Sequence, residues 1–143
     1  MVRTLTIRRF TICPGTFKET RERAVSVMER GQHLLFQGGS KRLLTAEDIR
    51  DFLIRCPQAI GLNVIAGPFI VRQESGWAGI VLIAESHISV HTDGLEVYVD
   101  VFSCREFPSP EVIDLAYDLL FLYDMPESAI RQLERGWATP PSR

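Results

Sequence analysis

The sequence lacks the features that would place the protein in a membrane, in an export route or in a repeat array. Its 143 residues contain no apolar run near the roughly 20 residues that a membrane-spanning helix needs. The first residues lack the hydrophobic core of a signal peptide, and no segment is repeated or of low complexity. We therefore expect one globular domain with no membrane partner, long enough to bury most of a core.

Cysteine is also scarce, and its three copies form no recognisable pattern. Cys13, Cys56 and Cys104 are odd in number and widely spaced, and no pair has the short spacing of zinc ligands. We therefore expect neither a metal site nor a disulfide framework. Reduced thiols are typical of the cytoplasm, which is the location we expect for this protein.

Charge is nearly balanced, at a net −2, but it is unevenly distributed. The first 31 residues carry seven Lys or Arg against three Glu, which could form a basic arm for nucleic acid. However, acidic and basic residues interleave along residues 17–30, with Ala24, Val25 and Met28 on one side. This pattern is typical of an amphipathic helix, so we expect no nucleic-acid partner.

Hydrophobic periodicity predicts a series of strands. The expected strands cover residues 4–12, 32–36, 62–71, 79–85, 87–92 and 96–103. Asp93-Gly94, between the last two, is a strong hairpin signal. Thr45 is a candidate N-cap for a helix through Cys56, with Asp48 at the capping-box position and Pro57 as the stop signal.

Two further helices are expected towards the C-terminus. One opens at Ser109-Pro110-Glu111, with proline at its first position and an acidic residue in its first turn. Its predicted core face consists of Ile113, Ala116, Leu119 and Leu120. The other runs from Pro126 to Gly136. Together these elements predict an α+β fold, a two-layer α/β sandwich of mainly antiparallel sheet with helices on one face.

Reactive side chains gather where an apolar run ends. Residues 79–84 read as a buried strand, and the chain continues as Glu-Ser-His-Ile-Ser-Val-His-Thr through residue 92. A serine after a glutamate is common and carries little information alone. Residues 84–92, followed by Val-Asp-Val-Phe-Ser-Cys at residues 99–104, resemble the small bacterial and archaeal S-adenosylmethionine decarboxylases.

This resemblance implies that the chain cuts itself between Glu85 and Ser86 and converts Ser86 into a pyruvoyl cofactor. It covers roughly residues 31–136 and is strong across residues 79–104. It therefore divides the chain into an N-terminal extension of unassigned role, residues 1–30, and a decarboxylase-like domain, residues 31–143.

The implied chemistry gives each reactive residue a role. For the cut, the hydroxyl of Ser86 must attack the carbonyl of Glu85, and a base must then remove the α-proton of Ser86. His91 matches the family's processing histidine. A substrate α-amine would form a Schiff base with the pyruvoyl group, and Cys104 matches the donor that protonates the carbon after carbon dioxide leaves. His87 points away from Ser86 by strand alternation, so we expect it to be structural.

The sequence departs from the family pattern around the expected nucleoside site. The family reads Phe-x-Pro-x-Gly-x-Ser-Gly, where this chain has Arg-Gln-Glu-Ser-Gly-Trp-Ala-Gly at residues 72–79. Ala78 replaces a processing serine, and Arg72 replaces the aromatic residue that stacks on adenine. Glu96 is the candidate for a ribose-binding glutamate, in a rebuilt loop. Arg72 and Glu96 would suit a small charged substrate better than a nucleoside.

Three functions therefore stay open. The first is a pyruvoyl-dependent decarboxylase of S-adenosylmethionine in spermidine (polyamine) biosynthesis. The second is an arginine or ornithine decarboxylase that uses the same cofactor. The third is a non-processing, non-catalytic homologue that acts as a binding or regulatory subunit, which the loss of serine at position 78 favours and the intact Glu85, Ser86, His91 and Cys104 argue against. The family resemblance and the apolar run at residues 119–122 predict a homodimer.

Overall fold

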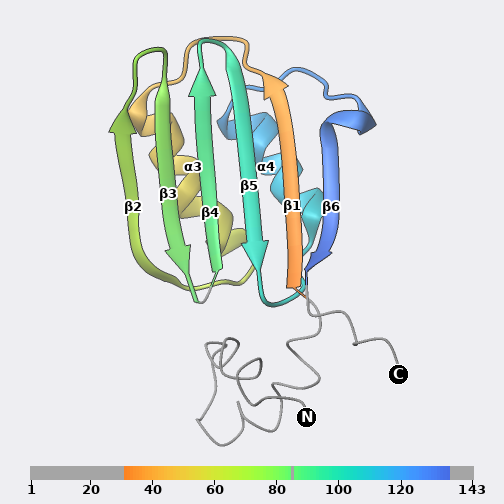
Figure 1. Ribbon diagram of the computed structural model, residues 1–143. Coiled ribbons are helices and arrows are strands. Elements are labelled where there is room, and N and C mark those ends of the chain that lie inside the picture. The colour runs from red at the N-terminus through yellow and green to blue at the C-terminus, as the bar shows by residue number, and fades with distance from the viewer. Residues whose placement is uncertain (1–30, 85, 136–143) are drawn as a thin grey trace, which may run out of the picture.

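The computed structural model describes residues 31–84 and 86–135 as one antiparallel sheet with helices packed against it (Figure 1). The strands of this sheet lie in the order β2-β3-β4-β5-β1-β6. In chain order the elements are β1 (Gly31–Gly39), α3 (Ala46–Ala59), β2 (Val64–Arg72), β3 (Trp77–Ile83), β4 (Ser86–Asp93), β5 (Glu96–Ser103), α4 (Ser109–Leu119), a 3₁₀ turn η1 (Glu127–Ala129) and β6 (Ile130–Arg135). The strand expected at residues 4–12 and the helix expected at 17–30 lie outside the described residues.

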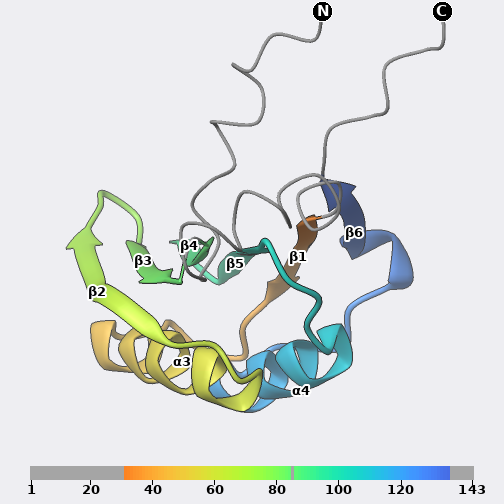
Figure 2. The same cartoon turned by 90° about the horizontal axis from the view of Figure 1, so that it is seen from below.

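Helices α3 and α4 lie on the same face of the sheet (Figure 2). Among the described residues no element covers the opposite face, which we call the open face. This arrangement confirms the predicted α+β sandwich of two layers. Within the same residues, no helix is long and apolar enough to cross a membrane.

The core lies between the sheet and the two helices. Strands β3, β4 and β5 alternate buried and more exposed side chains, so every second residue points towards the helices. The largest fully buried side chains include Phe52, Ile49 and Leu53 of α3. Gly79 of β3 allows this close packing, because a Cβ atom there would lie only 2.8 Å from Cγ2 of Ile49. This packing of α3 against β3 fixes the sheet to the helices.

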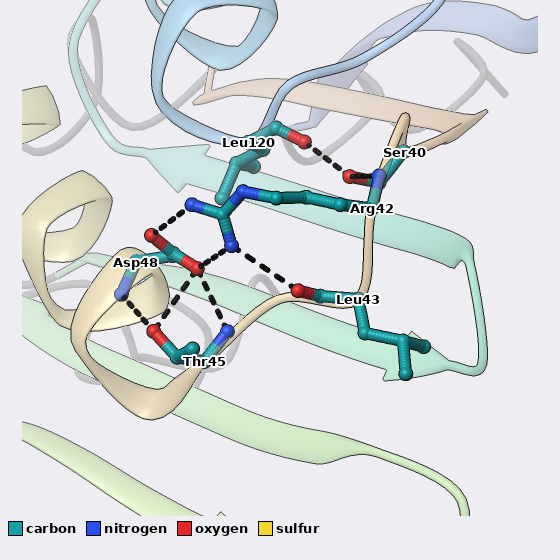
Figure 3. A network of polar contacts seen from close by, with 6 residues as sticks. All are labelled: Ser40, Arg42, Leu43, Thr45, Asp48 and Leu120. Carbon is teal, nitrogen blue, oxygen red and sulfur yellow. Dashed lines mark hydrogen bonds and ion pairs between the residues drawn. The ribbon is translucent and has the colours of Figure 1, made fainter.

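A polar network fixes the start of α3 (Figure 3). The Asp48 amide donates to the Thr45 hydroxyl at 3.2 Å, and the Thr45 amide donates to the Asp48 carboxylate at 2.7 Å, which confirms the predicted capping box. Arg42 donates to both carboxylate oxygens of Asp48, at 2.8 and 2.9 Å. Its guanidinium also lies 4.0 Å from the ring centre of Phe121, just after α4. The network therefore links the two helices.

Two of the predicted helices differ from those in the structure. Pro57 was predicted to stop α3, but it lies inside the last turn, and the helix continues to Ala59 without the hydrogen bond that an N–H at position 57 would donate. The helix expected from Pro126 to Gly136 is instead the turn η1 followed by β6. Strand β6 forms because the edge of β1 offers it six paired positions, and this pairing overrides the local signal.

The apolar face of α4 also differs from the prediction. Val112 and Ala116 are its buried apolar residues, and Leu120, which caps the helix, is also buried. Ile113 and Leu119 are only partly buried. Leu120 and Leu122, from the apolar run at 119–122, are 0% and 3% exposed and belong to the protein's own core. This run is therefore not the spare contact surface that the sequence suggested.

Candidate functional site

Ser86 and Cys104 meet at one end of the sheet. Ser86 is the first residue of β4, and Cys104 directly follows β5, which is the neighbouring strand. The backbone N–H of Cys104 donates a hydrogen bond to Oγ of Ser86 at 3.1 Å. Both residues are 9% exposed. The structure therefore brings together the expected cleavage residue and the expected proton donor.

The connection that precedes Ser86 is very short. Ile83 of β3 is the register partner of Ser86, so only residues 84 and 85 join the two strands. Ala84 is anchored by its amide, which donates to the carbonyl of Asn63 at 3.0 Å. Glu85 itself lies outside the described residues. The expected cleavage point therefore falls at the end of a two-residue hairpin loop, directly before a buried hydroxyl.

A mostly apolar pocket of about 560 Å³ opens beside Ser86. Its lining residues come from β1 to β6 and are His33, Ile65, Leu82, Ile83, Ser86, His87, Phe102 and Arg135. The ring of His87 lies against Phe102, with 5.8 Å between their centres. Burial and the neighbouring His33 lower the pKa of His87, which favours its neutral form, although Asp100 acts in the opposite direction. The pocket can therefore hold a small molecule against Ser86.

Other predicted residues lie at the opposite end of the sheet. His91 of β4 and Tyr98 of β5 are register partners on the open face, with 6.3 Å between their ring centres. The hydroxyl of Tyr98 donates a short hydrogen bond to the carboxylate of Glu96. This bond is the main cause that raises the pKa of Tyr98. His91, Tyr98 and Glu96 therefore form a second polar group, which we call the distal cluster.

Arg72 does not join the distal cluster. It pairs with Trp77 across the β2–β3 hairpin, and its guanidinium lies 4.9 Å from the ring centre of Trp77. Trp77 packs against the core on the helix-covered side of the sheet. Ala78, the register partner of His91, lies on the open face, at the position where the sequence resemblance implied a processing serine. The structure therefore separates Arg72 from Glu96, the other residue expected to bind substrate.

Ser86 and His91 are also far apart, although both lie on β4. They lie five residues apart on β4, which at about 3.3 Å per residue corresponds to roughly 17 Å. Strand alternation also places them on opposite faces: Ser86 starts the buried series, and His91 is exposed on the open face. Within one chain of this structure, His91 is too far from Ser86 to take its α-proton.

Comparison with known proteins places this architecture in a family. The model of the S-adenosylmethionine decarboxylase family matches residues 35–135, which include the whole sheet except the first residues of β1. The chain belongs to the S-adenosylmethionine decarboxylase family. Its predicted family resemblance is thus confirmed.

Several individual relatives carry the name S-adenosylmethionine decarboxylase proenzyme. A protein of Aquifex aeolicus is 36% identical over 94 residues, which cover 63% of this chain and 67% of that protein. One from Clostridium botulinum strain Loch Maree is 29% identical over 113 residues, covering 74% and 94%. One from Pyrococcus abyssi is 33% identical over 86 residues, covering 57% of this chain and 62% of the relative, slightly less than two thirds of its length.

Three residues beside the expected sites of this family member were not predicted. Tyr98 could have been found from strand alternation, because Glu96, Tyr98, Asp100 and Phe102 share one face of β5. His33 lies in the expected strand at residues 32–36, but nothing in that stretch shows its distance from Ser86. Arg135 could not be found, because the segment that carries it was expected to be a helix.

The two cysteines of the described region differ sharply. Cys56 is fully buried in the core, and burial raises the pKa of its thiol to about 12, so it stays protonated and unreactive. Cys104 is free, like Cys56, but borders Ser86. In the described residues no group of His, Cys, Asp or Glu has a metal-binding arrangement.

Proposed function

We propose that this protein is a self-processing decarboxylase of S-adenosylmethionine, acting in polyamine (spermidine) biosynthesis with a pyruvoyl cofactor made from Ser86. The observation that carries the proposal is the hydrogen-bonded pair of Ser86 and Cys104 beside a pocket. Family membership and the names of the relatives, which include the word proenzyme, support the substrate and the processing step.

The local geometry suits the cut before Ser86. The Cys104 amide engages one lone pair of the Ser86 oxygen and fixes the position of the hydroxyl. The proton of that hydroxyl remains free to leave as the oxygen attacks the carbonyl of the preceding residue. Because this donor belongs to the backbone, it stays in place whatever side chain occupies position 104.

The residues around position 86 also fit a pyruvoyl group. Such a group needs a chain end shielded from water, and Ser86 is 9% exposed at the mouth of the pocket. When formed, the group supplies a carbonyl that acts as the electron sink for loss of carbon dioxide. Cys104, whose backbone amide is hydrogen-bonded to the side chain of residue 86, would supply the thiol that protonates the product carbon.

The proposal includes a homodimer formed through the open face. This face exposes large apolar side chains, which are Phe69, Val71, Ile80, Leu82 and Leu133. A two-fold axis that lies between the two sheets, parallel to them and perpendicular to their strands, would stack the open faces and reverse the strand directions. It would bring the distal cluster of one chain over the Ser86 end of the other. His91 would then act on Ser86 of the partner, which resolves their separation within one chain.

Two further parts of the proposal concern the cellular location and the substrate. A cytoplasmic location is favoured by the free thiols of Cys56 and Cys104. The substrate is a small α-amino compound, and among the candidates S-adenosylmethionine is favoured over arginine and ornithine by the relatives' names. Among the described residues, Ala78 favours a non-catalytic subunit, because the family resemblance implies a processing serine there; the hydrogen-bonded pair of Ser86 and Cys104 argues against it.

The intact mass of the purified protein tests the proposal. We expect two fragments, residues 1–85 and 86–143, with the second blocked to N-terminal sequencing by the pyruvoyl group. Ser86→Ala should give one uncut chain. Ser89→Ala, a half-buried serine on the same strand, is the matched control and should cleave normally. Wild-type protein that stays intact after long incubation would refute self-processing.

A further inference from the structure

We propose that Arg135 and His33 form a subsite for the carboxylate group of the substrate, beside Ser86. This inference rests on the proposed function, because a decarboxylase substrate with an α-amine must also present its carboxylate near position 86. Nothing in the family resemblance assigns either residue a role.

The contact between the two residues defines the protonation pattern of the histidine ring. Nη1 of Arg135 lies 3.0 Å from Nδ1 of His33. A guanidinium can only donate hydrogen bonds, so Nδ1 must accept. The ring proton of a neutral His33 is therefore on Nε2, which makes Nε2 a donor.

This donor lacks a partner. Nε2 of His33 is buried and has no hydrogen-bond partner in the structure. The nearest acidic oxygen, Oδ1 of Asp100, is 3.6 Å away, too far for a hydrogen bond. Buried donors are rarely left unsatisfied, so this site favours a ligand that brings an acceptor oxygen.

The cation beside this donor is directed over the pocket. Strands β5 and β6 flank β1, and the guanidinium carbon of Arg135 on β6 lies 5.6 Å from the ring centre of Phe102 on β5. Phe102, His33 and Ser86 line the same pocket, whose remaining walls are mostly apolar. Arg135 is exposed, so its guanidinium can reach a ligand in this pocket, and with the ring of His33 it presents N–H donors and positive charge beside Ser86, an arrangement that suits a carboxylate. The carboxylate of Asp100, 3.6 Å from Nε2 of His33, opposes an incoming carboxylate; its side chain is 43% exposed, so contact with water reduces this repulsion.

The subsite can be tested by comparing a substrate with its own decarboxylated product. The full-length Ser86→Ala protein, which does not turn over substrate, would be titrated by calorimetry with S-adenosylmethionine and with decarboxylated S-adenosylmethionine. The pairs arginine and agmatine, and ornithine and putrescine, would be titrated in parallel. Each pair differs only in the carboxylate group.

We expect Arg135→Met, added to Ser86→Ala, to weaken binding of the carboxylate-bearing compound by about tenfold or more, as loss of a charged hydrogen bond should. Binding of the decarboxylated partner should change less than about twofold. His33→Leu should act in the same direction, and His33→Gln, which keeps a donor near Nε2, should be milder. Arg131→Met is the matched control: this exposed arginine on β6 borders a different pocket and should change neither affinity.

The outcomes separate the subsite from the proposed function. Equal weakening of both members of a pair, no effect of Arg135→Met, or no binding of any compound would overturn the subsite. Carboxylate-selective binding together with a wild-type chain that never cleaves would keep the subsite and refute the proposed function. Normal cleavage with no carboxylate selectivity would support self-processing and refute the subsite.

Discussion

The backbone of Cys104 donates a hydrogen bond of 3.1 Å to the side chain of Ser86, 18 residues away in sequence. The thiol of Cys104 takes no part in this bond. The two proposed steps, chain cleavage and product protonation, therefore depend on different atoms of the same residue. Substitution of the side chain should separate them.

We predict that Cys104→Ala still cleaves before residue 86 but decarboxylates about 10²–10⁴ times more slowly, the usual contribution of a positioned acid. Intact mass and release of labelled carbon dioxide would be measured on the same sample. Cys56→Ala is the control, because that thiol is buried in the core and protonated, and it should affect neither step. Normal turnover of Cys104→Ala would place the proton donor elsewhere.

Mixed dimers should show whether His91 acts on the partner chain. Neither Ser86→Ala nor His91→Ala should cleave when made alone. When both are produced together with different tags, the His91→Ala chain should be cut in the mixed dimer, because its Ser86 meets an intact His91 from the other chain. Mass spectrometry of the separated tags would show which chain is cut. The absence of any cleavage in mixed dimers would mean that His91 does not work across an interface.

The open face should be the dimer interface. Ile80→Glu places a charge among its apolar side chains and should shift the protein from dimer to monomer in light scattering at micromolar concentration. Ile54→Glu is closely matched, because Ile54 on α3 is 38% exposed and Ile80 is 37% exposed. Ile54→Glu should leave the dimer intact. A monomeric wild-type protein that is cleaved and active would contradict this assembly.

Asp48 should make the stability of the fold depend on pH in the acidic range. Its partial burial would raise its pKa, but hydrogen bonds from Arg42 and Thr45 outweigh this effect and lower the pKa. Stability from a carboxyl group of this kind is present above its ordinary pKa of about 4 and is lost as the pH falls through the lower folded value.

Asp48→Asn should therefore cost about 1 kcal/mol of unfolding free energy at pH 7, the usual size of a capping interaction, and less at pH 3. Urea denaturation at both pH values would measure this. Asp51→Asn, whose carboxylate makes an exposed ion pair with Arg55 at 3.3 Å, is the control and should have little effect at either pH. An equal loss for Asp48→Asn at both pH values would show that the ionised carboxylate is not the cause.

The sequence predicted the elements whose signal is local. The capping box of Thr45 and Asp48, the Asp93-Gly94 hairpin and the alternating strands β3 to β5 all depend on near neighbours, and all were confirmed. Strand β6 was missed because it depends on the free edge of β1, about a hundred residues away in the chain.

The candidate site shows the same limit. Motif matching selected Ser86 and Cys104, and the fold brings them together. Motif matching also selected Arg72, but position in a motif does not reveal which side of a sheet a residue faces, and Arg72 lies over Trp77 on the helix-covered side. The relation between His33 and Arg135 required strand pairing that no local pattern contains.

The order of strands in the sheet has a consequence for the mature protein. A break before Ser86 would assign β1, β2, β3 and α3 to one fragment and β4, β5, β6 and α4 to the other. In the sheet order β2-β3-β4-β5-β1-β6, the pairings β3–β4, β5–β1 and β1–β6, three of the five, would join strands of different fragments. The two pieces would stay interlocked, and melting would become a dissociation whose midpoint rises with protein concentration. Each cut chain would therefore behave as an obligate heterodimer of its own two pieces.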